Sequence, residues 1–235
     1  MRLPMLTHAA AAQLDRDLMS TPGFSLDQLM ELAGLSVACA VAAAFPACRR
    51  VLTFAGPGNN GGDALVAARH LAHFGFEPTV VVPKTSFANL ITQLHWLDVP
   101  VLTSAPPPAQ WPTEFDIVLD GVFGFSFNAA DGVRKPYDSI LAQLRNTTLP
   151  IAAIDIPSGW HVEKGDVHQL GVAMPDLLIS LTAPKLCAAF FTGKQHYLGG
   201  RFLPPKLAAK YQLEALPKYP GTAQCVEVSD YECVL

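Results

Sequence analysis

The run Gly56-Pro57-Gly58-Asn59-Asn60-Gly61-Gly62-Asp63 lies between an apolar segment, residues 51–55, and a helical pattern over residues 63–75. A strand that delivers a glycine-rich turn to a helix N-terminus presents free backbone N–H groups and the positive end of the helix dipole, which suits a phosphate or another anion. The glycines let the backbone pass close to a ligand, and the asparagines add polar groups. The run therefore predicts a strand-turn-helix unit with a ligand site in its turn; the alternative is a tight connection without a ligand.

Two common nucleotide-binding motifs do not account for this turn. The Gly-Lys-Ser/Thr ending of a P-loop is absent, and Gly56, Gly58 and Gly61 make only a short match to Gly-x-Gly-x-x-Gly. The acidic residue that binds a ribose about 20 residues further on in dinucleotide-binding folds is also missing, because Glu77 comes early and Pro78 follows it. An ordinary hydride-transfer dehydrogenase is therefore the less favoured interpretation.

The composition is typical of one soluble domain over residues 1–235. Half of the 235 residues are hydrophobic, which is enough for one large core. The formal charge of -4 and the scattered Lys and Arg residues provide no basic stripe, so a nucleic-acid partner is not expected. The five cysteines form no Cys-x-x-Cys pair, which favours a reducing compartment over a disulfide framework.

The longest uncharged stretch, residues 32–48, is alanine-rich and is interrupted by Pro46. It is shorter than the ~20 residues that a membrane-spanning helix needs, so it predicts a buried helix and no membrane association. The N-terminal residues show no apolar signal core and little positive charge. We therefore expect neither an export signal nor a transit peptide, and a cytoplasmic or mitochondrial location.

Short apolar runs alternate with helical patterns along the chain, and each kind predicts an element of its own. The predicted strands are residues 51–55, 79–82, 117–119, 151–156 and 177–181, and the predicted helices are residues 7–19, 26–45, 63–75, 89–97 and 137–144. The strands are apolar throughout rather than alternating with polar residues. This pattern indicates an α/β fold with a parallel sheet that is covered on both faces.

Two aspartates, Asp120 and Asp155, directly follow predicted strands or end them. In an open parallel sheet the ligand lies beyond the carboxyl ends of the strands, where a buried carboxylate needs a cation, a donor or water. Taken singly, Asp120 also fits a cap on the following turn, and Asp155 fits an acceptor for the N–H groups of residues 157–159. Together with the glycine-rich turn, the two aspartates favour a single site.

Oxygen-bearing side chains at these strand ends resemble the ligand set of a hard cation. They are Asn60, Asp120 and Ser158, which offer amide, carboxylate and hydroxyl oxygens. The Cys and His residues of the sequence do not have the spacing that is typical of a zinc site.

Longer stretches carry a family resemblance over nearly the whole chain. They are residues 28–36 (Gln-Leu-Met-Glu-Leu-Ala-Gly-Leu-Ser), 56–63, 123–127, 154–160, 177–185 and 197–202 (Tyr-Leu-Gly-Gly-Arg-Phe). In these residues the chain resembles the NAD(P)H-hydrate epimerases of the YjeF N-terminal domain family. The resemblance implies a Rossmann-like three-layer αβα sandwich with a mostly parallel central sheet, a homodimer, and interconversion of the R and S hydrates NADHX and NADPHX. A separate dehydratase, specific for the S form, then restores the cofactor.

The same resemblance implies the residues of the site. The implied substrate-binding residues are Asn59, Asn60, Gly61, Gly62, Asp63, Gly124, Phe125, Ser126, Phe127, Asn128, Asp131 and Asp155. The implied potassium ligands, for one K+ per subunit, are Asn60, Asp120 and Ser158, the oxygen set noted above. The chemistry needs a proton donor and acceptor, for which Asp155 is favoured and Asp131 comes second. The segment 128–132 is somewhat longer than its counterpart in the family.

Several residues near these strand ends have two interpretations. Lys185 either reaches a phosphate or lies at the surface. Phe123, Phe125 and Phe127 either shield a nucleotide ring or serve packing. His161 fits an exposed histidine better than a pH-dependent acid.

The main alternative to an epimerase is a non-catalytic nucleotide- or apolipoprotein-binding module, because relatives of the family are also described as apolipoprotein-binding proteins. An intact pocket and an interaction surface can coexist in one protein. Catalysis and binding without turnover therefore both remain open at the level of the sequence.

Overall fold

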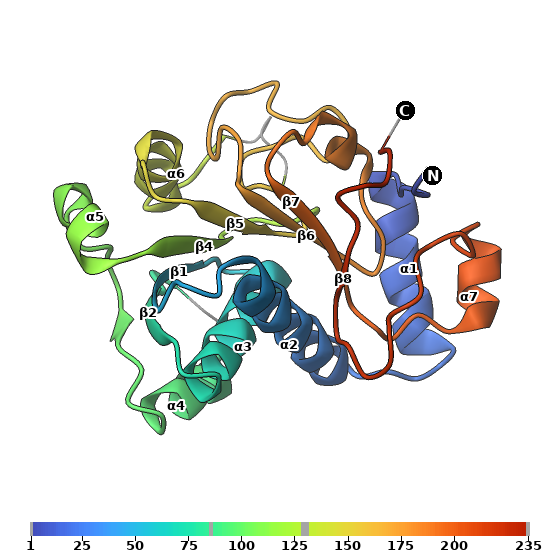
Figure 1. The fold of residues 1–235 in the computed structure, drawn as a ribbon, viewed down its shortest axis with the longest axis horizontal. Helices are drawn as coiled ribbons and strands as arrows, with labels where there is room; N and C mark the ends of the chain where they lie inside the picture. The colour runs from blue at the N-terminus through green and yellow to red at the C-terminus, as the bar shows by residue number, and fades with distance from the viewer. Residues whose placement is uncertain (1, 85–86, 128–131, 234–235) are drawn as a thin grey trace.

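A central eight-stranded sheet organises the chain in this computed structural model, which describes residues 2–84, 87–127 and 132–233 (Figure 1). The strand order is β3-β2-β1-β4-β5-β6-β7-β8, and all neighbours are parallel except β7 and β8. The strands are β1 Arg50–Ala55, β2 Glu77–Val81, β3 Val101–Leu102, β4 Ile117–Gly121, β5 Ile151–Ile154, β6 Leu177–Leu181, β7 Gln195–Gly199 and β8 Val226–Glu227.

Helices cover both faces of this sheet (Figure 1). The α-helices are α1 His8–Ser20, α2 Leu26–Ala44, α3 Asn59–His73, α4 Ala88–His95, α5 Trp111–Glu114, α6 Tyr137–Asn146 and α7 Pro205–Lys210, and two short 3-10 helices are η1 Pro108–Gln110 and η3 Leu186–Phe190. Helices α2, α3 and α4 lie on one face and α6 on the other. The predicted Rossmann-like three-layer αβα sandwich with a mostly parallel sheet is therefore confirmed.

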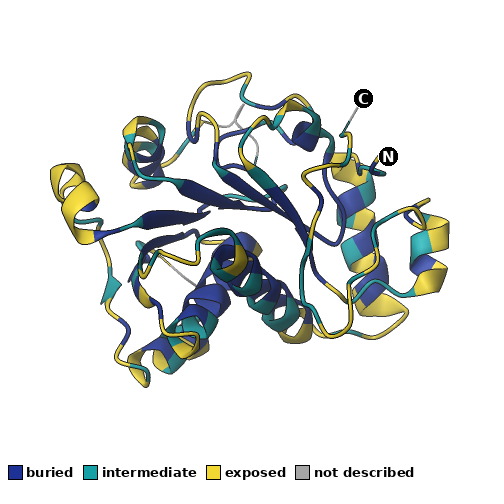
Figure 2. Cartoon of the chain, viewed as in Figure 1, coloured by how far each residue is buried: buried dark blue, intermediate teal, exposed yellow. Residues whose placement is uncertain are grey.

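The alternation of side chains along a strand explains why both faces are apolar. On β1, Val51 and Ala55 pack in the core with α2 and α3, whereas Leu52 and Phe54 pack in the core with α6. Successive side chains of a strand point to opposite faces, so a strand covered on both sides must be apolar throughout. Figure 2 shows the central strands β1, β4, β5, β6 and β7 as mostly buried ribbons between the two helical layers.

The order of the strands places a crevice between β1 and β4. The chain runs from β1 outward to β2 and β3, and then returns to β4 on the other side of β1. Connections therefore leave the carboxyl ends of these two neighbouring strands in opposite directions. This topological switch point is where open α/β sheets bind their ligands.

Helix α2 has the length and apolarity of a membrane-spanning helix, and only this helix does so within the described ranges. Half of its apolar window is nevertheless buried inside the protein. Gly34 packs so tightly on α3 that a Cβ built there would lie 2.4 Å from Val66 Cγ1. The helix therefore packs as a core helix, as the sequence predicts.

The structure differs from the sequence-based expectation at several element boundaries. Helix α3 begins at Asn59 rather than at residue 63, so the asparagines belong to its first turn and not to a loop. Strand β5 ends at Ile154, because Asp155 turns into the left-handed region of φ. The short strand β3, the half-polar strand β7 and the antiparallel edge strand β8 were not predicted, since none is a continuous apolar run.

Candidate active site

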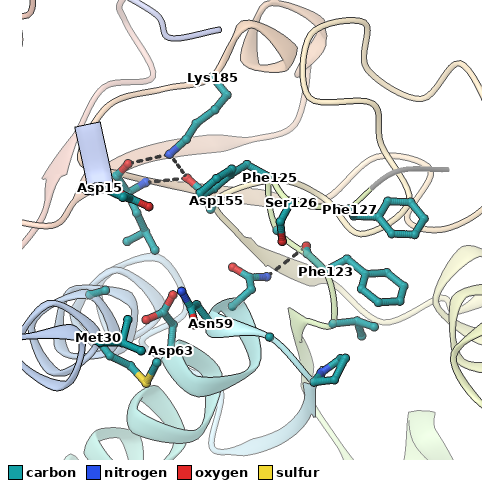
Figure 3. A pocket seen from close by; sticks show the side chains of 18 of the residues that line it. Asp15, Met30, Asn59, Asp63, Phe123, Phe125, Ser126, Phe127, Asp155 and Lys185 are labelled. Carbon is teal, nitrogen blue, oxygen red and sulfur yellow. Dashed lines mark hydrogen bonds and ion pairs between the residues drawn. The ribbon is translucent and has the colours of Figure 1, made fainter. Parts of the chain in front are cut away.

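A cavity of about 740 Å³ opens at the carboxyl ends of the central strands, at the switch point between β1 and β4 (Figure 3). Its walls come from α1, α2, the turn after β1 and the segments that follow β2, β4, β5 and β6. The cavity therefore gathers the strand ends at which the sequence places its candidate residues. The cavity is lined by eight of the predicted substrate-binding residues: Asn59, Asn60, Asp63, Gly124, Phe125, Ser126, Phe127 and Asp155.

The start of α3 presents free backbone N–H groups to this cavity. Gly58 is the N-cap, and its carbonyl accepts the N–H groups of Gly61 (2.9 Å) and Gly62 (3.2 Å). The N–H groups of Gly58, Asn59 and Asn60 have no acceptor in the part of the chain that the structure describes. These three donors and the helix dipole suit a phosphate group.

The glycines of the turn serve packing more than ligand approach. None of Gly56, Gly58, Gly61 and Gly62 has a positive φ, so the turn does not require glycine for its backbone conformation. A Cβ at Gly56 would lie 1.7 Å from the carbonyl oxygen of Val122, and a Cβ at Gly61 would lie 1.9 Å from that of Gly56. Among these glycines only Gly58 has open space around a built Cβ. Thus Gly61 shapes the turn, and its neighbour Gly62 packs under Met30.

Substituting Gly61 by Ala is expected to destabilise the fold by about 1–3 kcal/mol, because the new methyl group meets backbone that cannot move aside freely. Thermal unfolding of Gly61→Ala should show a clear decrease in Tm, while the matched variant Gly58→Ala should unfold close to wild type. Equal Tm values for the two variants would contradict the packing role of Gly61.

Asp155 and Lys185 form a buried ion pair in the wall of the cavity (Figure 3). Asp155 Oδ1 accepts the Lys185 ammonium and the N–H of Leu181 (3.1 Å), and Lys185 also donates to the carbonyl of Leu181 (2.9 Å). Lys185 is only 4 % exposed, so its interpretation as a surface lysine is wrong. The partners of Asp155 lie at β6 and after it, and not in the turn 157–159.

Two backbone outliers flank this ion pair. Asp155 has a φ of 61° and Thr182 a φ of 65°, a region that side-chain-bearing residues rarely adopt and β-branched residues avoid. Their N–H groups are held by the carbonyls of Ile179 (2.7 Å) and Gly199 (2.9 Å). Such conformations cost about 1–3 kcal/mol each and gather at functional sites. Both residues line the cavity.

Asp63 is a second carboxyl group of the cavity, and it has a different environment from Asp155 (Figure 3). It is buried, and its side chain has no hydrogen-bond partner among the residues that the structure describes. Burial raises its pKa well above the ordinary value, and the negative charges of Asp155 and Asp15 add to the effect. Asp63 therefore keeps its proton to higher pH than an ordinary aspartate, whereas Asp155 is paired with the Lys185 ammonium.

Asp15 of α1 is a third carboxyl group, and the sequence analysis did not identify it. Burial raises its pKa, and the Lys185 charge opposes that shift. A signal was present in the sequence, because Asp15 lies on the helix face that also carries the buried residues Ala11, Leu14 and Leu18. An acid on an apolar stripe is unusual unless it faces a site.

Two of the predicted potassium ligands, Asn60 and Ser158, contact the carbonyl oxygen of Phe123, and the third, Asp120, contacts Ser158. Asn60 Nδ2 donates to this oxygen (3.1 Å), and Ser158 Oγ lies 3.3 Å from it. Asp120 accepts Ser158 Oγ (2.6 Å) and N–H (2.8 Å), and Val122 N–H (3.2 Å). Burial raises the pKa of Asp120 to about 6, although these hydrogen bonds oppose the shift.

A hard cation fits this set. Asp120 is fully buried, and no cationic side chain contacts it in the described part of the chain. Its hydrogen-bond partners are the Ser158 hydroxyl group and the backbone N–H groups of Val122 and Ser158. Ion binding would compensate its charge, and the cap on the following turn, through Val122, is also present. The described residues contain no cluster of three His, Cys, Asp or Glu side chains that could hold a metal ion.

The aromatic residues after β4 combine packing with exposure to the cavity. Phe123 stacks on Phe127 with ring centroids 4.4 Å apart, and it contacts Tyr137 at 5.4 Å. Lys185 Nζ lies 5.9 Å from the ring centroid of Phe125. All three phenylalanines line the cavity, so both interpretations of them hold in part.

Gly61 and Gly62, which the resemblance implies as substrate-binding residues, do not line the cavity. His161 is half-buried rather than exposed, accepts the N–H of Glu163 (3.0 Å) and does not line the cavity. Asn128 and Asp131 lie outside the described residues, so the second catalytic candidate stays a prediction.

The sheet order, the turn after β1 and the cavity at the switch point define an α/β protein of the Rossmann-like three-layer class with a ligand site at the carboxyl edge of its sheet. A family model described as YjeF-related protein N-terminus matches residues 26–187, more than half of the chain. The chain therefore belongs to the YjeF_N family, which is known as the NAD(P)HX epimerase domain.

Two known proteins illustrate this relationship. The crystal structure of yeast ynu0, YNL200c, is similar to this chain with a TM-score of 0.88 and 39% sequence identity, over 96% of this chain and 100% of that chain. The Arabidopsis thaliana protein named pyridoxine/pyridoxamine 5'-phosphate oxidase 1, chloroplastic, is 50% identical over 241 residues, which cover 96% of this chain. The chain spans only 45% of the length of that relative.

Proposed function

We propose that this protein is an NAD(P)H-hydrate epimerase that interconverts the R and S forms of NADHX and NADPHX. The observation that carries the proposal is one cavity, in a YjeF_N family member, that combines the anion site of α3 with the buried Asp155–Lys185 pair. The oxidase name of the Arabidopsis relative belongs to a protein more than half of which has no counterpart here, so it does not decide the activity of this chain.

The cavity suggests how a dinucleotide binds. Its volume of about 740 Å³ lies within the usual range of small-molecule sites, roughly 300–1,000 Å³. The pyrophosphate is placed on the free N–H groups of Gly58, Asn59 and Asn60, and the hydrated nicotinamide ring extends towards Asp155, beyond β5. This arrangement follows the general use of the switch point in α/β sheets.

Two carboxyl groups in different states can exchange a hydroxyl group between the faces of the ring. Protonated Asp63 donates a proton to the leaving hydroxyl, the C–O bond breaks, and water departs while the ring nitrogen supplies the electron pair. The carboxylate of Asp155 then takes a proton from a water molecule whose oxygen bonds to the same ring carbon, and transfer of that proton through solvent to Asp63 restores the starting state. The different environments of the two carboxyl groups assign the acid role to Asp63 and the base role to Asp155. Each proton transfer typically contributes a factor of about 10² to 10⁴ to the rate.

We also propose that Asn60, Asp120 and Ser158 hold one K+ per subunit. The ion would connect the carboxyl ends of β1, β4 and β5 beside the pyrophosphate, which is an electrostatic and structural contribution. A monovalent ion polarises water weakly, so no step is assigned to it. A homodimer and a functional partnership with a separate dehydratase stay predictions from the family resemblance.

Potassium should stabilise the protein more at about pH 7.5 than at about pH 5. The pKa of Asp120 is raised from 3.8 to about 6 without an ion, so ionising this carboxyl costs the fold roughly 3 kcal/mol. Folding stability therefore decreases as pH rises between these two values, and K+, which binds only the carboxylate, offsets that loss above them. Thermal unfolding in KCl and in choline chloride measures the difference. The variant Asp120→Asn should lose it, and an unchanged potassium response in this variant would overturn the ion assignment.

The activity itself is tested by a coupled assay. Purified R-NADHX is incubated with the protein in potassium buffer together with an S-specific dehydratase and ATP, and the formation of NADH is followed by absorbance. We expect acceleration in proportion to protein concentration, and the same from the control Asp230→Asn, an exposed residue outside the cavity. Binding of the hydrate without acceleration would instead support a non-catalytic nucleotide-binding module.

A further inference from the structure

The two ends of the cavity differ in charge. The end next to α1 and the segments after β5 and β6 carries three aspartates and one lysine, which are Asp15, Asp63, Asp155 and Lys185. The opposite end carries Lys84, Arg134 and Lys135. These three cations are exposed, and none has an ion-pair partner in the part of the chain that the structure describes.

Lys84 occupies a position with a known use in dinucleotide-binding sheets. It follows the carboxyl end of β2, which ends at Val81. In Rossmann folds an acid near this strand end binds the 2'-hydroxyl of the adenosine ribose, and a cation there accommodates a 2'-phosphate. Residues 82–84 contain no acid, and Glu77 lies at the start of β2, at the far edge of the sheet. The strand end therefore favours a phosphate over a hydroxyl group.

The backbone around the three cations is held together by Tyr137. This buried residue begins α6, and its hydroxyl donates to the carbonyl of Lys84 (3.4 Å). Its N–H donates to the carbonyl of Arg134 (3.0 Å), which closes the turn that carries Lys135. The segment after β2 and the segment before α6 are thus fixed side by side, and their cations enter one end of the same cavity.

We propose that Lys84, Arg134 and Lys135 form a subsite for the 2'-phosphate of NADPHX, so that the phosphorylated hydrate is the preferred substrate. The assignment of the reacting end rests on the proposed function. The anion site of α3 separates the two ends, as a pyrophosphate separates nicotinamide from adenosine. Hydrogen bonds from Lys and Arg to a phosphate are charge-assisted and discriminate against a ligand that lacks it.

The probes are adenosine 2',5'-bisphosphate, adenosine 3',5'-bisphosphate and 5'-AMP, with affinities measured by calorimetry at fixed salt. We expect the 2',5'-bisphosphate to bind on the order of 10-fold more tightly than 5'-AMP, and also more tightly than the 3',5' isomer of equal charge. The variants Lys84→Glu and Arg134→Glu should abolish this preference. The matched control Lys206→Glu changes an exposed lysine of α7 outside the cavity and should retain it.

Equal binding of 2',5'-bisphosphate and 5'-AMP by wild type would overturn the subsite. An equal loss of the preference in Lys206→Glu would also overturn it, because such a loss would indicate only a general charge effect. The ratio of kcat/KM for NADPHX over NADHX gives a second measurement, and Lys84→Glu should lower it about 10-fold. A protein without epimerase activity that still prefers the 2',5'-bisphosphate refutes the proposed function and keeps the subsite. An active epimerase that binds the 2',5'-bisphosphate no more tightly than 5'-AMP would refute the subsite and keep the proposed function.

Discussion

Asp155→Asn is expected to lower kcat for epimerisation by about 10²- to 10⁴-fold, because an amide of the same shape cannot take the proton of the incoming water. KM should change much less, since the substitution leaves the N–H groups of α3, the proposed pyrophosphate site, unaffected. The measurement is the rate of R to S conversion at saturating NADPHX. Wild-type turnover by Asp155→Asn would remove this residue from the mechanism.

A fold effect must be separated from this loss, because Asp155 compensates a buried ammonium. Removing one partner of a buried ion pair typically costs about 3–5 kcal/mol. The double variant Asp155→Asn/Lys185→Met removes both charges of this pair, so its Tm should recover towards wild type while its activity stays low. Recovery of activity together with Tm would show that Asp155 acts only on stability.

Asp63→Asn is expected to cause a loss of similar size, about 10²-fold or more, and to change the pH profile. The pKa of Asp63 is raised by burial and by the charges of Asp155 and Asp15, while Lys185 opposes the shift. The protonated form therefore persists to higher pH than that of an ordinary aspartate, and it is lost as pH rises through the raised value. Wild-type kcat should decrease on that alkaline side, and Asp63→Asn should lack this limb.

The stability of the same variant distinguishes a catalytic from a structural role. Because the folded-state pKa of Asp63 is raised, the fold loses stability as pH increases from 3.8 to that value. An uncharged amide escapes this loss, so Asp63→Asn should be at least as stable as wild type at neutral and alkaline pH. A variant that is inactive and also less stable there would contradict the assignment.

The sequence predicted the parts of the site that depend on local patterns. The apolar run before Gly56 predicted β1 and the turn into α3, and the ends of two other apolar runs placed Asp120 and Asp155 at one edge of the sheet. Parallel strands bring their carboxyl ends together whatever the details of packing, so such residues can be placed from order alone. Asn60, Asp120 and Ser158 lie at the same edge of the sheet for the same reason.

Other features depend on tertiary packing and could not be placed from order. Asp15 reaches the cavity because α1, which precedes the whole sheet, packs at its β6–β7 side near Lys185. Lys185 is buried because the chain turns at Thr182 with a positive φ, which no periodicity reports. The glycines of the turn were attributed to ligand approach, whereas contacts with Val122 and Met30 require them.

The most direct test starts from pure R-NADPHX in one sample and pure S-NADPHX in another, each incubated with the protein in potassium buffer. The R and S forms in each sample are then separated by chromatography at a series of times. We predict that both samples converge on one R to S ratio, at a rate proportional to the concentration of wild-type protein and near the buffer rate with Asp155→Asn. Interconversion at the spontaneous rate in the presence of wild-type protein would contradict the epimerase assignment.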